Sequence, residues 1–422
     1  MWTCSCSSSA SRFSGNSFTK SAGHNPAVHR RFRFVTICFF SAQYLPTVGG
    51  VERYTFNLAR RVVAAGHTAI VVTSSLPGLP ELETDEHGIR IYRLPVWPLM
   101  NGRFPVLKPG RAFRALAKKL WAEPIGFCVI NTRFYISSLY AARQCHKRGI
   151  PAIVVDHSTG HLPMGNPLLN AAGACYEHLA AVWLKACRPR FFGVSRAVCR
   201  WLEHFGIRPE GQLYNAVDPA EVRALTQASD AVDWRVRLGL PADEKLVVFL
   251  GRVIPEKGVA ELIEAFAHAD LPGCSLVVAG DGPLLPKLRE NCPPKVHLAG
   301  AVPYAQAMQL LAQAQLYCLP TYYAEGFPTT FLEAAACGCP ILTTRTGGSD
   351  ELLPDESYGV QLDGVDPQAL TAALKRCLTD HAWGAAAAQK TAARLEEHFT
   401  WEAVTRELLR LARAQQPDCK GN

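Results

Sequence analysis

The chain has 422 residues, more than a single hydrophobic core usually covers, so two domains are expected. With 48% hydrophobic and 19% charged residues, the composition is that of a globular protein and excludes a disordered or fibrous one. The 15 cysteines follow no zinc-site spacing and the chain is too long for a small disulfide-stapled domain, so a reducing cytoplasm fits best.

The charge is distributed unevenly along the chain. Residues 1–210 contain 26 Lys and Arg against 10 Asp and Glu, a net charge of +16, whereas the remainder contains 18 against 26, a net charge of −8. Such an asymmetry indicates that the two halves meet different partners. The first half is expected to face something anionic.

No segment has the pattern of a membrane-spanning helix or a signal peptide. The uncharged stretches at 34–51 and 297–324 are interrupted by proline together with glycine or glutamine. Residues 1–31 lack the apolar stretch that a signal peptide needs. We interpret residues 1–31 as a disordered leader or a misassigned start.

The first half alternates strand and helix patterns. An apolar run at residues 32–40 predicts a buried strand, and a glycine loop leads from it into an amphipathic helix at 52–65 and a second strand at 68–73. This order is the βαβ unit of a parallel sheet. Further strands are expected at 127–131, 152–156 and 191–194.

The same alternation restarts in the second half. Strands are expected at 246–250, 275–279, 296–298, 316–319 and 340–343, and helices at 260–268, 285–291, 304–314 and 329–336. The fold class is therefore α/β, with two doubly wound domains at 32–214 and 215–395. Residues 396–422 are expected to hold a last helix, at 401–414, that packs back on the first domain.

Open parallel sheets bind ligands at the carboxyl ends of their strands, and the first candidate site follows the strand at 246–250. Arg252 and Lys257 lie in the same loop there, between Gly251 and Gly258. Two cations in one loop suit a diphosphate, because Arg can bind two oxygens and Lys adds a point charge. A solvated basic loop is the alternative.

A second candidate follows the strand at 316–319. Gly326 and the residues after it open a helix, whose free N–H groups and positive dipole end suit an anion. Glu325 stands just outside this helix, and Glu333 lies about two turns further along. Each glutamate taken singly also fits an ordinary capping or helical position.

Two glycine turns follow other strands. Gly49 and Gly50 can bring backbone amides close to a phosphate or a sugar, although such a turn alone is a weak signal. Gly280 and Gly282 also follow a strand, but the G-x-G-x-x-G dinucleotide motif is not completed. This argues against a nicotinamide enzyme.

These motifs, in this order and spacing, resemble the retaining family-4 glycosyltransferases of GT-B fold. The resemblance spans about residues 34–414 and includes Asn215-Ala-Val-Asp218, in which Ala216 replaces the family's glycine. It implies two Rossmann-like domains that face each other across a cleft. Gly347-Gly-Ser-Asp-Glu351 departs from the family's Gly-Gly-Ile-Pro-Glu, so altered contacts to the donor sugar nucleotide are expected there.

The resemblance implies a role for each candidate residue. Arg252 and Lys257 would neutralise the donor diphosphate. Glu325 would contact hydroxyls of the transferred sugar, and Glu333 would contact the ribose. His157 matches the family's cleft histidine, with a core or surface histidine as the alternative. The expected catalytic set is Glu325, His157, Arg252 and Lys257, and the expected donor-binding set is Gly49, Gly50, Arg252, Lys257, Glu325, Gly326, Phe327, Thr329, Thr330 and Glu333.

The mechanism that the resemblance implies is retention without an enzymic nucleophile. The leaving diphosphate would help to deprotonate the acceptor hydroxyl, while the protein supplies orientation and charge stabilisation. Neither a metal nor another cofactor is expected, because the two cations take the place of a metal ion.

A basic amphipathic helix is expected at residues 109–121. Its apolar residues lie on one face, and four cations lie toward the other: Arg111, Arg114, Lys118 and Lys119. Together with Trp121, this pattern is typical of a segment that lies on an anionic membrane. The alternative is a helix packed on its own sheet with a solvated basic face. The membrane interpretation places the protein on the inner face of the plasma membrane.

The expected function is transfer of a hexose-type sugar from a UDP- or GDP-linked donor to a glycan or lipid-linked acceptor, in cell-envelope or extracellular polysaccharide synthesis. One alternative is a related epimerase or hydrolase of nucleotide sugars. Another is a nucleic-acid binder that uses the basic half. Nucleic acid is not the expected partner, because no recognised binding motif accompanies that charge.

Overall fold

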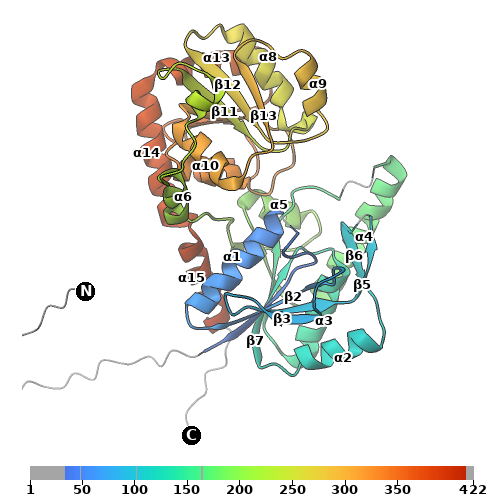
Figure 1. Cartoon of the computed structure of the whole chain (residues 1–422). Coiled ribbons are helices and arrows are strands. Elements are labelled where there is room, and N and C mark those ends of the chain that lie inside the picture. Colours follow the sequence, from blue (N-terminus) through green and yellow to red (C-terminus); the bar gives the residue numbers. More distant parts are fainter. Residues whose placement is uncertain (1–33, 48, 101, 163–164, 415–422) are drawn as a thin grey trace, which may run out of the picture. The chain divides into compact units, whose positions relative to one another are not determined.

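The computed structural model describes residues 34–47, 49–100, 102–162 and 165–414, and the expected leader lies outside these ranges (Figure 1). Two sheets of parallel strands follow each other along the chain, with eight strands in the first and six in the second. The α/β class with two Rossmann-like sheets is confirmed.

The first sheet has the strand order β10-β9-β8-β7-β1-β2-β4-β3. Its strands are β1 (Thr36–Phe40), β2 (Thr68–Ser74), β3 (Leu82–Thr84), β4 (Arg90–Leu94), β7 (Ile125–Asn131), β8 (Ala152–Asp156), β9 (Arg190–Gly193) and β10 (Gly211–Gln212). All neighbours pair in parallel except β3 and β4. The centre is apolar because helices cover both faces.

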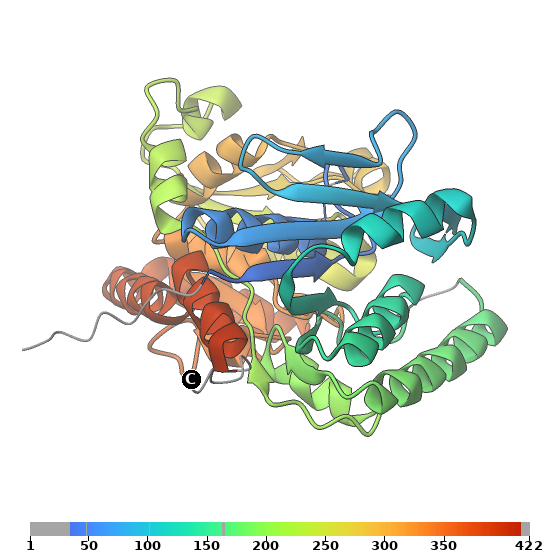
Figure 2. The ribbon, with the colours of Figure 1, turned by 90° about the horizontal axis from the view of Figure 1, so that it is seen from below.

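Alternate residues of β1 face different layers of this half. Ile37 and Phe39 pack toward α1 (Gly50–Ala64), and Cys38 and Phe40 pack toward the other face. That second face is covered by α2 (Arg111–Leu120), α3 (Ile136–Arg148) and α4 (Pro167–Ala186). Figure 2 shows α4, in green, as a long helix beside α3. A small hairpin of β5 (Val96–Leu99) and β6 (Phe104–Leu107) was not expected.

The second sheet has the strand order β13-β12-β11-β14-β15-β16, and every neighbouring pair is parallel. Its strands are β11 (Lys245–Leu250), β12 (Cys274–Ala279), β13 (Val296–Gly300), β14 (Leu316–Leu319), β15 (Ile341–Thr344) and β16 (Val360–Leu362). The chain order changes direction between β11 and β14, and ligands bind at such switch points. The loops after these two strands hold the expected phosphate and sugar residues.

Helices precede, connect and follow the strands of this half. They are α6 (Pro219–Thr226), α7 (Trp234–Leu238), α8 (Val259–Ala269), α9 (Leu285–Glu290), α10 (Tyr304–Gln313), α11 (Thr329–Ala336), α12 (Ser349–Leu352) and α13 (Pro367–Thr379). In the first half, α5 (Arg196–Glu203) follows β9. The short 3-10 turn η1 (Pro255–Lys257) carries Lys257.

The boundary expected at residues 395 and 396 falls inside α14 (His381–His398). Buried Thr391, Leu395 and Phe399 continue the helical spacing beyond it, so the chain turns only at Phe399 and Thr400. Thr400 pairs with Val217 in an isolated parallel bridge. The final helix α15 (Trp401–Ala414) then packs on α1 of the first half.

Candidate functional site

Two cavities lie where α1 of the first half meets the loops of the second sheet. One, of about 430 Å³, is lined by residues that include Arg252, Thr329, Thr330 and Glu333. The other, of about 300 Å³, is lined by residues that include Gly50, Asn215, Thr329 and Glu333. Arg53, Tyr304, Thr329 and Glu333 line both, so the two cavities adjoin.

The loops after β11 and β14 are joined through Lys257 and Glu325. The Lys257 ammonium donates to the Glu325 carboxylate, and both side chains are mostly buried. The Tyr323 ring faces both cations of the first loop, with its centroid 5.5 Å from Arg252 Cζ and 5.7 Å from Lys257 Nζ. Two residues expected to act on the diphosphate and one expected to act on the sugar therefore lie together.

Close packing of backbone keeps these two loops together. Gly258 has a left-handed φ of +67°, and a Cβ there would collide with the carbonyl oxygen of Pro320. A side chain at Gly258 would therefore separate the loops. The position of Lys257 thus depends on the glycine that follows it.

Glu333 lies on α11 and is buried at the wall shared by the two cavities. Burial raises the pKa of its carboxyl to about 7, and the nearby positive charge of Arg53 opposes this shift. A carboxyl with this pKa can change its protonation state when a polar ligand enters. It can then accept hydrogen bonds from hydroxyl groups.

Arg53 is a functional candidate that the sequence analysis missed. It lies in the first turns of α1, lines both cavities, and holds its guanidinium 5.1 Å from the centroid of the Tyr304 ring. It brings a cation of the first half to the cavities of the second. The available signal was its place three residues after Gly50, in the helix that the glycine turn opens.

His157 follows β8 and is held in a defined orientation. Its Nε2 lies 3.1 Å from the side-chain oxygen of Asn131, which can only accept, so Nε2–H donates and Nδ1 keeps its lone pair. Burial lowers the pKa of His157 to about 4, against the opposing effect of Asp156. The imidazole is therefore neutral at neutral pH.

The loop of residues 325–327 is fixed by side chains from the first half and by Asn215 at the expected domain boundary. Its three carbonyl oxygens accept hydrogen bonds from Thr159 Oγ1 to Glu325 (3.0 Å), from Ser195 Oγ to Gly326 (2.6 Å) and from Asn215 Nδ2 to Phe327 (2.8 Å). A Cβ at Gly326 would also collide with the carbonyl oxygen of His157. His157 and the Glu325 loop are thus brought together through backbone contact.

The glycine pair at the start of α1 has two different environments. Gly50 lines the second cavity. Gly49 lies under the carboxylate of Glu52, where a Cβ would collide with it. Burial raises the pKa of Glu52. The structure therefore places Gly50 at the cavities and Gly49 beside the carboxylate end of the Glu52 side chain.

The segment that departs from the family motif packs behind Glu325. A Cβ at Gly347 would collide with the carbonyl oxygen of Glu325. Glu351 is buried, and its Oε1 accepts from the backbone N–H of Arg196 (2.6 Å) at the start of α5. Residues 347–351 line neither of the two cavities and lie against the Glu325 loop, so the altered donor contacts expected from this segment stay a prediction.

The helix expected to lie on a membrane has a different environment from the one anticipated. Leu116 and Leu120 of α2 are buried in the core of the first half, so its apolar face is occupied by its own sheet. Arg111, Arg114, Lys118 and Lys119 are exposed. The helix therefore packs on its own sheet with a solvated basic face, as the alternative had it, and its four cations stay available to an anionic partner, so the membrane contact stays a prediction.

A larger exposed apolar surface lies on α4 and was not expected. Leu168 is 80% exposed, Leu179 64% and Val182 61%. The available signal was residues 157–184, an uncharged stretch apart from Glu177. Within the described ranges, no helix combines the length and the apolar content needed to cross a bilayer.

The comparisons with known proteins cover both halves. The profile described as "Glycosyltransferase Family 4" matches residues 48–221, and that described as "Glycosyl transferases group 1" matches residues 230–397. A putative teichuronic acid biosynthesis glycosyltransferase of Bacillus subtilis is 35% identical over 305 residues, which are 68% of this chain and 75% of that protein. A phosphatidylinositol N-acetylglucosaminyltransferase component of Arabidopsis thaliana is 24% identical over 355 residues, which are 80% of this chain and 72% of that protein.

Solved structures agree in fold. Anabaena HepE in complex with UDP and glucose superposes with a TM-score of 0.68 at 18% identity, over 90% of this chain and 100% of that one. WaaG, a glycosyltransferase involved in lipopolysaccharide biosynthesis, superposes with a TM-score of 0.63 at 19% identity, over 90% and 100%. With both halves matched in order, the chain belongs to the group 1 glycosyltransferases of family 4, with the GT-B fold.

Proposed function

We propose that this glycosyltransferase is a retaining hexosyltransferase that uses a nucleoside-diphosphate sugar and delivers the sugar to a glycan or lipid-linked acceptor. The observation that carries the proposal is the meeting of Arg252, Lys257 and Glu325 beside cavities that Glu333 lines. Cations suit a diphosphate, and carboxylates suit sugar hydroxyls.

In this proposal the donor lies along the loops after β11 and β14. Arg252 and Lys257 bind the diphosphate together with the free N–H groups at the start of α11, where Thr329 and Thr330 line the first cavity. Glu333 accepts from the ribose hydroxyls. We favour UDP over GDP because HepE is described in complexes with UDP and with UDP-glucose.

The transfer step moves one glycosyl group and one proton. The bond between the sugar's anomeric carbon and the diphosphate oxygen breaks, and a bond from that carbon to the acceptor oxygen forms on the same face. The acceptor's proton passes to an oxygen of the leaving diphosphate. Arg252 and Lys257 stabilise the charge that develops there, so no metal ion is required. Glu325 and the neutral His157 orient the sugar.

For the acceptor, we propose a substrate presented at an anionic membrane. The cations of α2 are exposed. Two cation–π contacts connect the end of α2 to α3 and α3 to α4, namely Arg148 of α3 over Trp121 (4.7 Å) and Arg143 of α3 over Trp183 of α4 (5.8 Å). The exposed apolar face of α4 adjoins the second contact. Cations attract anionic lipid, and an apolar helix face suits its interface.

Two relatives agree with envelope or lipid-linked synthesis, one being a putative teichuronic acid biosynthesis glycosyltransferase and the other a phosphatidylinositol N-acetylglucosaminyltransferase component. We propose the inner face of the plasma membrane as the place of action. The twelve cysteines within the described ranges are all free, which fits a reducing compartment.

The decisive experiment is a panel of UDP-, GDP- and ADP-sugars scored by thermal stabilisation of the purified protein. Stabilisation by UDP-sugars above the others supports the donor assignment, and the best donor is then used to make product. The anomeric configuration of that product, read by NMR, tests retention. An inverted anomer overturns retention, and release of free sugar or of an epimer favours the hydrolase or epimerase alternative. Salt-sensitive gel shifts with DNA and RNA test the nucleic-acid alternative.

A further inference from the structure

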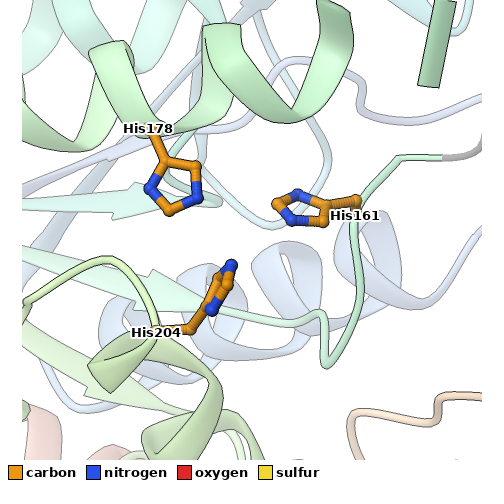
Figure 3. Close-up of side chains that lie close together, drawn as sticks. All are labelled: His161, His178 and His204. Atoms are coloured by element: carbon orange, nitrogen blue, oxygen red, sulfur yellow. The ribbon is translucent and has the colours of Figure 1, made fainter. Parts of the chain in front are cut away.

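Three histidines from separate segments come together on the first half, apart from the donor cavities. His161 lies in the loop after β8, His178 on α4 and His204 at the end of α5 (Figure 3). One imidazole nitrogen of each lies within 4.8 Å of those of the other two. Figure 3 shows the three rings turned toward a common space. None of the three lines either donor cavity.

Aromatic side chains hold these rings in position. Trp201 stacks on His204 with centroids 4.7 Å apart and an angle of 10° between the planes, and its centroid lies 5.0 Å from that of His161. Phe205 packs edge-on or tilted against all three imidazoles. Rings fixed in this way lose little freedom when they bind a common ligand.

A buried carboxylate stands behind one of the three histidines. Glu177 Oε2 lies 3.3 Å from His161 Nδ1. Glu177 also pairs with Arg133, and its Oε1 accepts from the backbone N–H of Leu162 (2.9 Å). His161 Nδ1 has no hydrogen-bond partner among the described residues, so this contact is electrostatic and places negative charge beside the ring, which favours a bound cation. The positive charge of Arg133 is shared between Glu177 and Asp156, so Arg133 leaves no unpaired charge near the histidines.

From this geometry we infer that His161, His178 and His204 form a binding site for a divalent transition metal, with Zn²⁺ as the preferred ion. Zinc takes nitrogen ligands at 2.0–2.1 Å and tetrahedral geometry, so its ligand atoms are about 3.3 Å apart. Small side-chain movements bring atoms within 4.8 Å of each other to this spacing. His178 and His204 are exposed, which gives the ion a path of entry.

The bound ion would join one loop that reaches the donor site to two helices that do not line its cavities. The loop that carries His161 also carries Thr159, which bonds to the backbone of Glu325, and α4 carries the exposed apolar face. The proposed role is structural: the ion fastens this loop to α4 and α5. It does not contact the diphosphate, so the inference stands independently of the proposed function.

The test uses the full chain, stripped of metal by a chelator and kept reduced with a phosphine. Titration with ZnCl₂ against a colorimetric chelator should show one tight site, and zinc should raise the melting temperature. His178→Gln and His204→Gln should each weaken that site by more than the ~10–100-fold typical of losing a ligand's hydrogen-bond partner. Both side chains are exposed, so both variants should fold.

Two controls isolate the site. His146→Gln removes an exposed histidine of α3 outside the cluster and should leave zinc affinity unchanged. Cys175→Ser removes an exposed thiol of α4 and should also leave it unchanged. Co²⁺ should give the visible spectrum of nitrogen ligation without a thiolate charge-transfer band. Zinc binding that survives in the His178→Gln/His204→Gln double variant, or that is lost in Cys175→Ser, would overturn the assignment. UDP-induced stabilisation in the double variant should stay at the parent level.

Discussion

In the second half, the cations proposed to bind the diphosphate are two residues, and each contacts a neighbouring side chain. Lys257 donates to Glu325, Arg252 faces Tyr323, and both belong to one loop in a half whose net charge is −8. In the first half, the cations of α2 stand exposed and the net charge is +16. A few cations fixed against aromatic and carboxylate groups suit one small ligand. Cations spread over a helix face suit an extended anionic surface.

The two halves also differ in how closely their surfaces are packed. Loops of the second half pack closely on backbone, on Pro320 at Gly258 and on His157 of the first half at Gly326. The first half leaves large apolar side chains of α4 exposed. Rigid packing fits the half proposed to hold the reacting sugar, and exposed apolar surface fits the half proposed to meet the acceptor.

The largest effect is expected from Glu325→Gln. It removes the charged partner of Lys257 and a proposed contact to the sugar, so turnover should fall on the order of 10³-fold, the upper end for losing a positioned electrostatic group. The melting temperature should change little. Glu256→Gln, an exposed glutamate of the neighbouring loop, is the matched control. Near-normal turnover in the Glu325 variant with its true donor would show that this residue was wrongly assigned.

The second largest effect tests the first half. Glutamine at Arg111, Arg114, Lys118 and Lys119 should weaken binding to anionic vesicles by up to ~700-fold, at about 1 kcal/mol per cation. The binding should also weaken with salt, because the Debye length falls from about 10 Å at 0.1 M to 3 Å at 1 M. Cosedimentation with vesicles measures both.

The matched control for this experiment replaces four exposed cations of the second half, namely Lys287, Arg289, Lys375 and Lys390. Those changes should leave vesicle binding and its salt dependence intact. Equal binding of the α2 variant and its parent to anionic vesicles would contradict the proposed membrane contact. Donor affinity of the α2 variant should stay unchanged, because none of its four cations lines either of the two cavities.

A smaller effect is expected at the diphosphate. Arg252→Ala and Lys257→Ala should each weaken donor binding by about 1.5–3 kcal/mol, or about 10–150-fold, the range for hydrogen bonds to charged groups. The loss should also appear with free UDP in calorimetry. Lys287→Ala, an exposed lysine of α9, is the control. Unchanged UDP binding in both variants would place the phosphates elsewhere.

The pH dependence of donor binding tests Glu333. Its pKa is raised to about 7, and the ionised carboxylate is the form that accepts from ribose hydroxyls. UDP affinity should therefore rise with pH, by about tenfold from pH 6 to pH 8, as the ionised fraction rises from ~0.1 to ~0.9. Glu333→Gln removes this contribution and leaves only the titration of UDP itself. Identical pH profiles for variant and parent would contradict the role.

The smallest effect expected is none. EDTA should leave turnover unchanged, because Arg252, Lys257 and the start of α11 are the groups proposed to neutralise the diphosphate. The same treatment should lower the melting temperature of protein that carries zinc at the histidine cluster. Activity that disappears with EDTA and returns only with Mg²⁺ or Mn²⁺ would contradict the donor site described above.

Elements with long apolar runs and clear endings could be predicted closely from the sequence. The expected strands at 152–156 and 316–319 and the helices at 329–336 and 401–414 coincide with β8, β14, α11 and α15. The hairpin of β5 and β6 was missed because Pro98 and Pro105 interrupt its strands. β10 and β16 have only two and three residues, too few to form a pattern.

Parts of the site that follow from sheet topology were accessible to sequence reasoning. Residues after β11 and β14 had to lie at one edge of the second sheet, and Lys257 and Glu325 do meet there. Site residues contributed by distant segments could not be predicted from the sequence, and Arg53 of the first half is an example. The amphipathic pattern of α2 fits packing on a sheet as well as packing on lipid, because either buries the same stripe of residues.

The exposed face of α4 has a practical consequence for handling the protein. Without lipid, most of the surface of Leu168, Leu179 and Val182 is left in contact with water. Large exposed apolar side chains on one helix promote self-association in dilute buffer. Oligomers seen in a detergent-free preparation would then arise from contacts between the exposed α4 surfaces of two molecules. Mild detergent or lipid nanodiscs should dissociate them, whereas an assembly held by a built interface would persist.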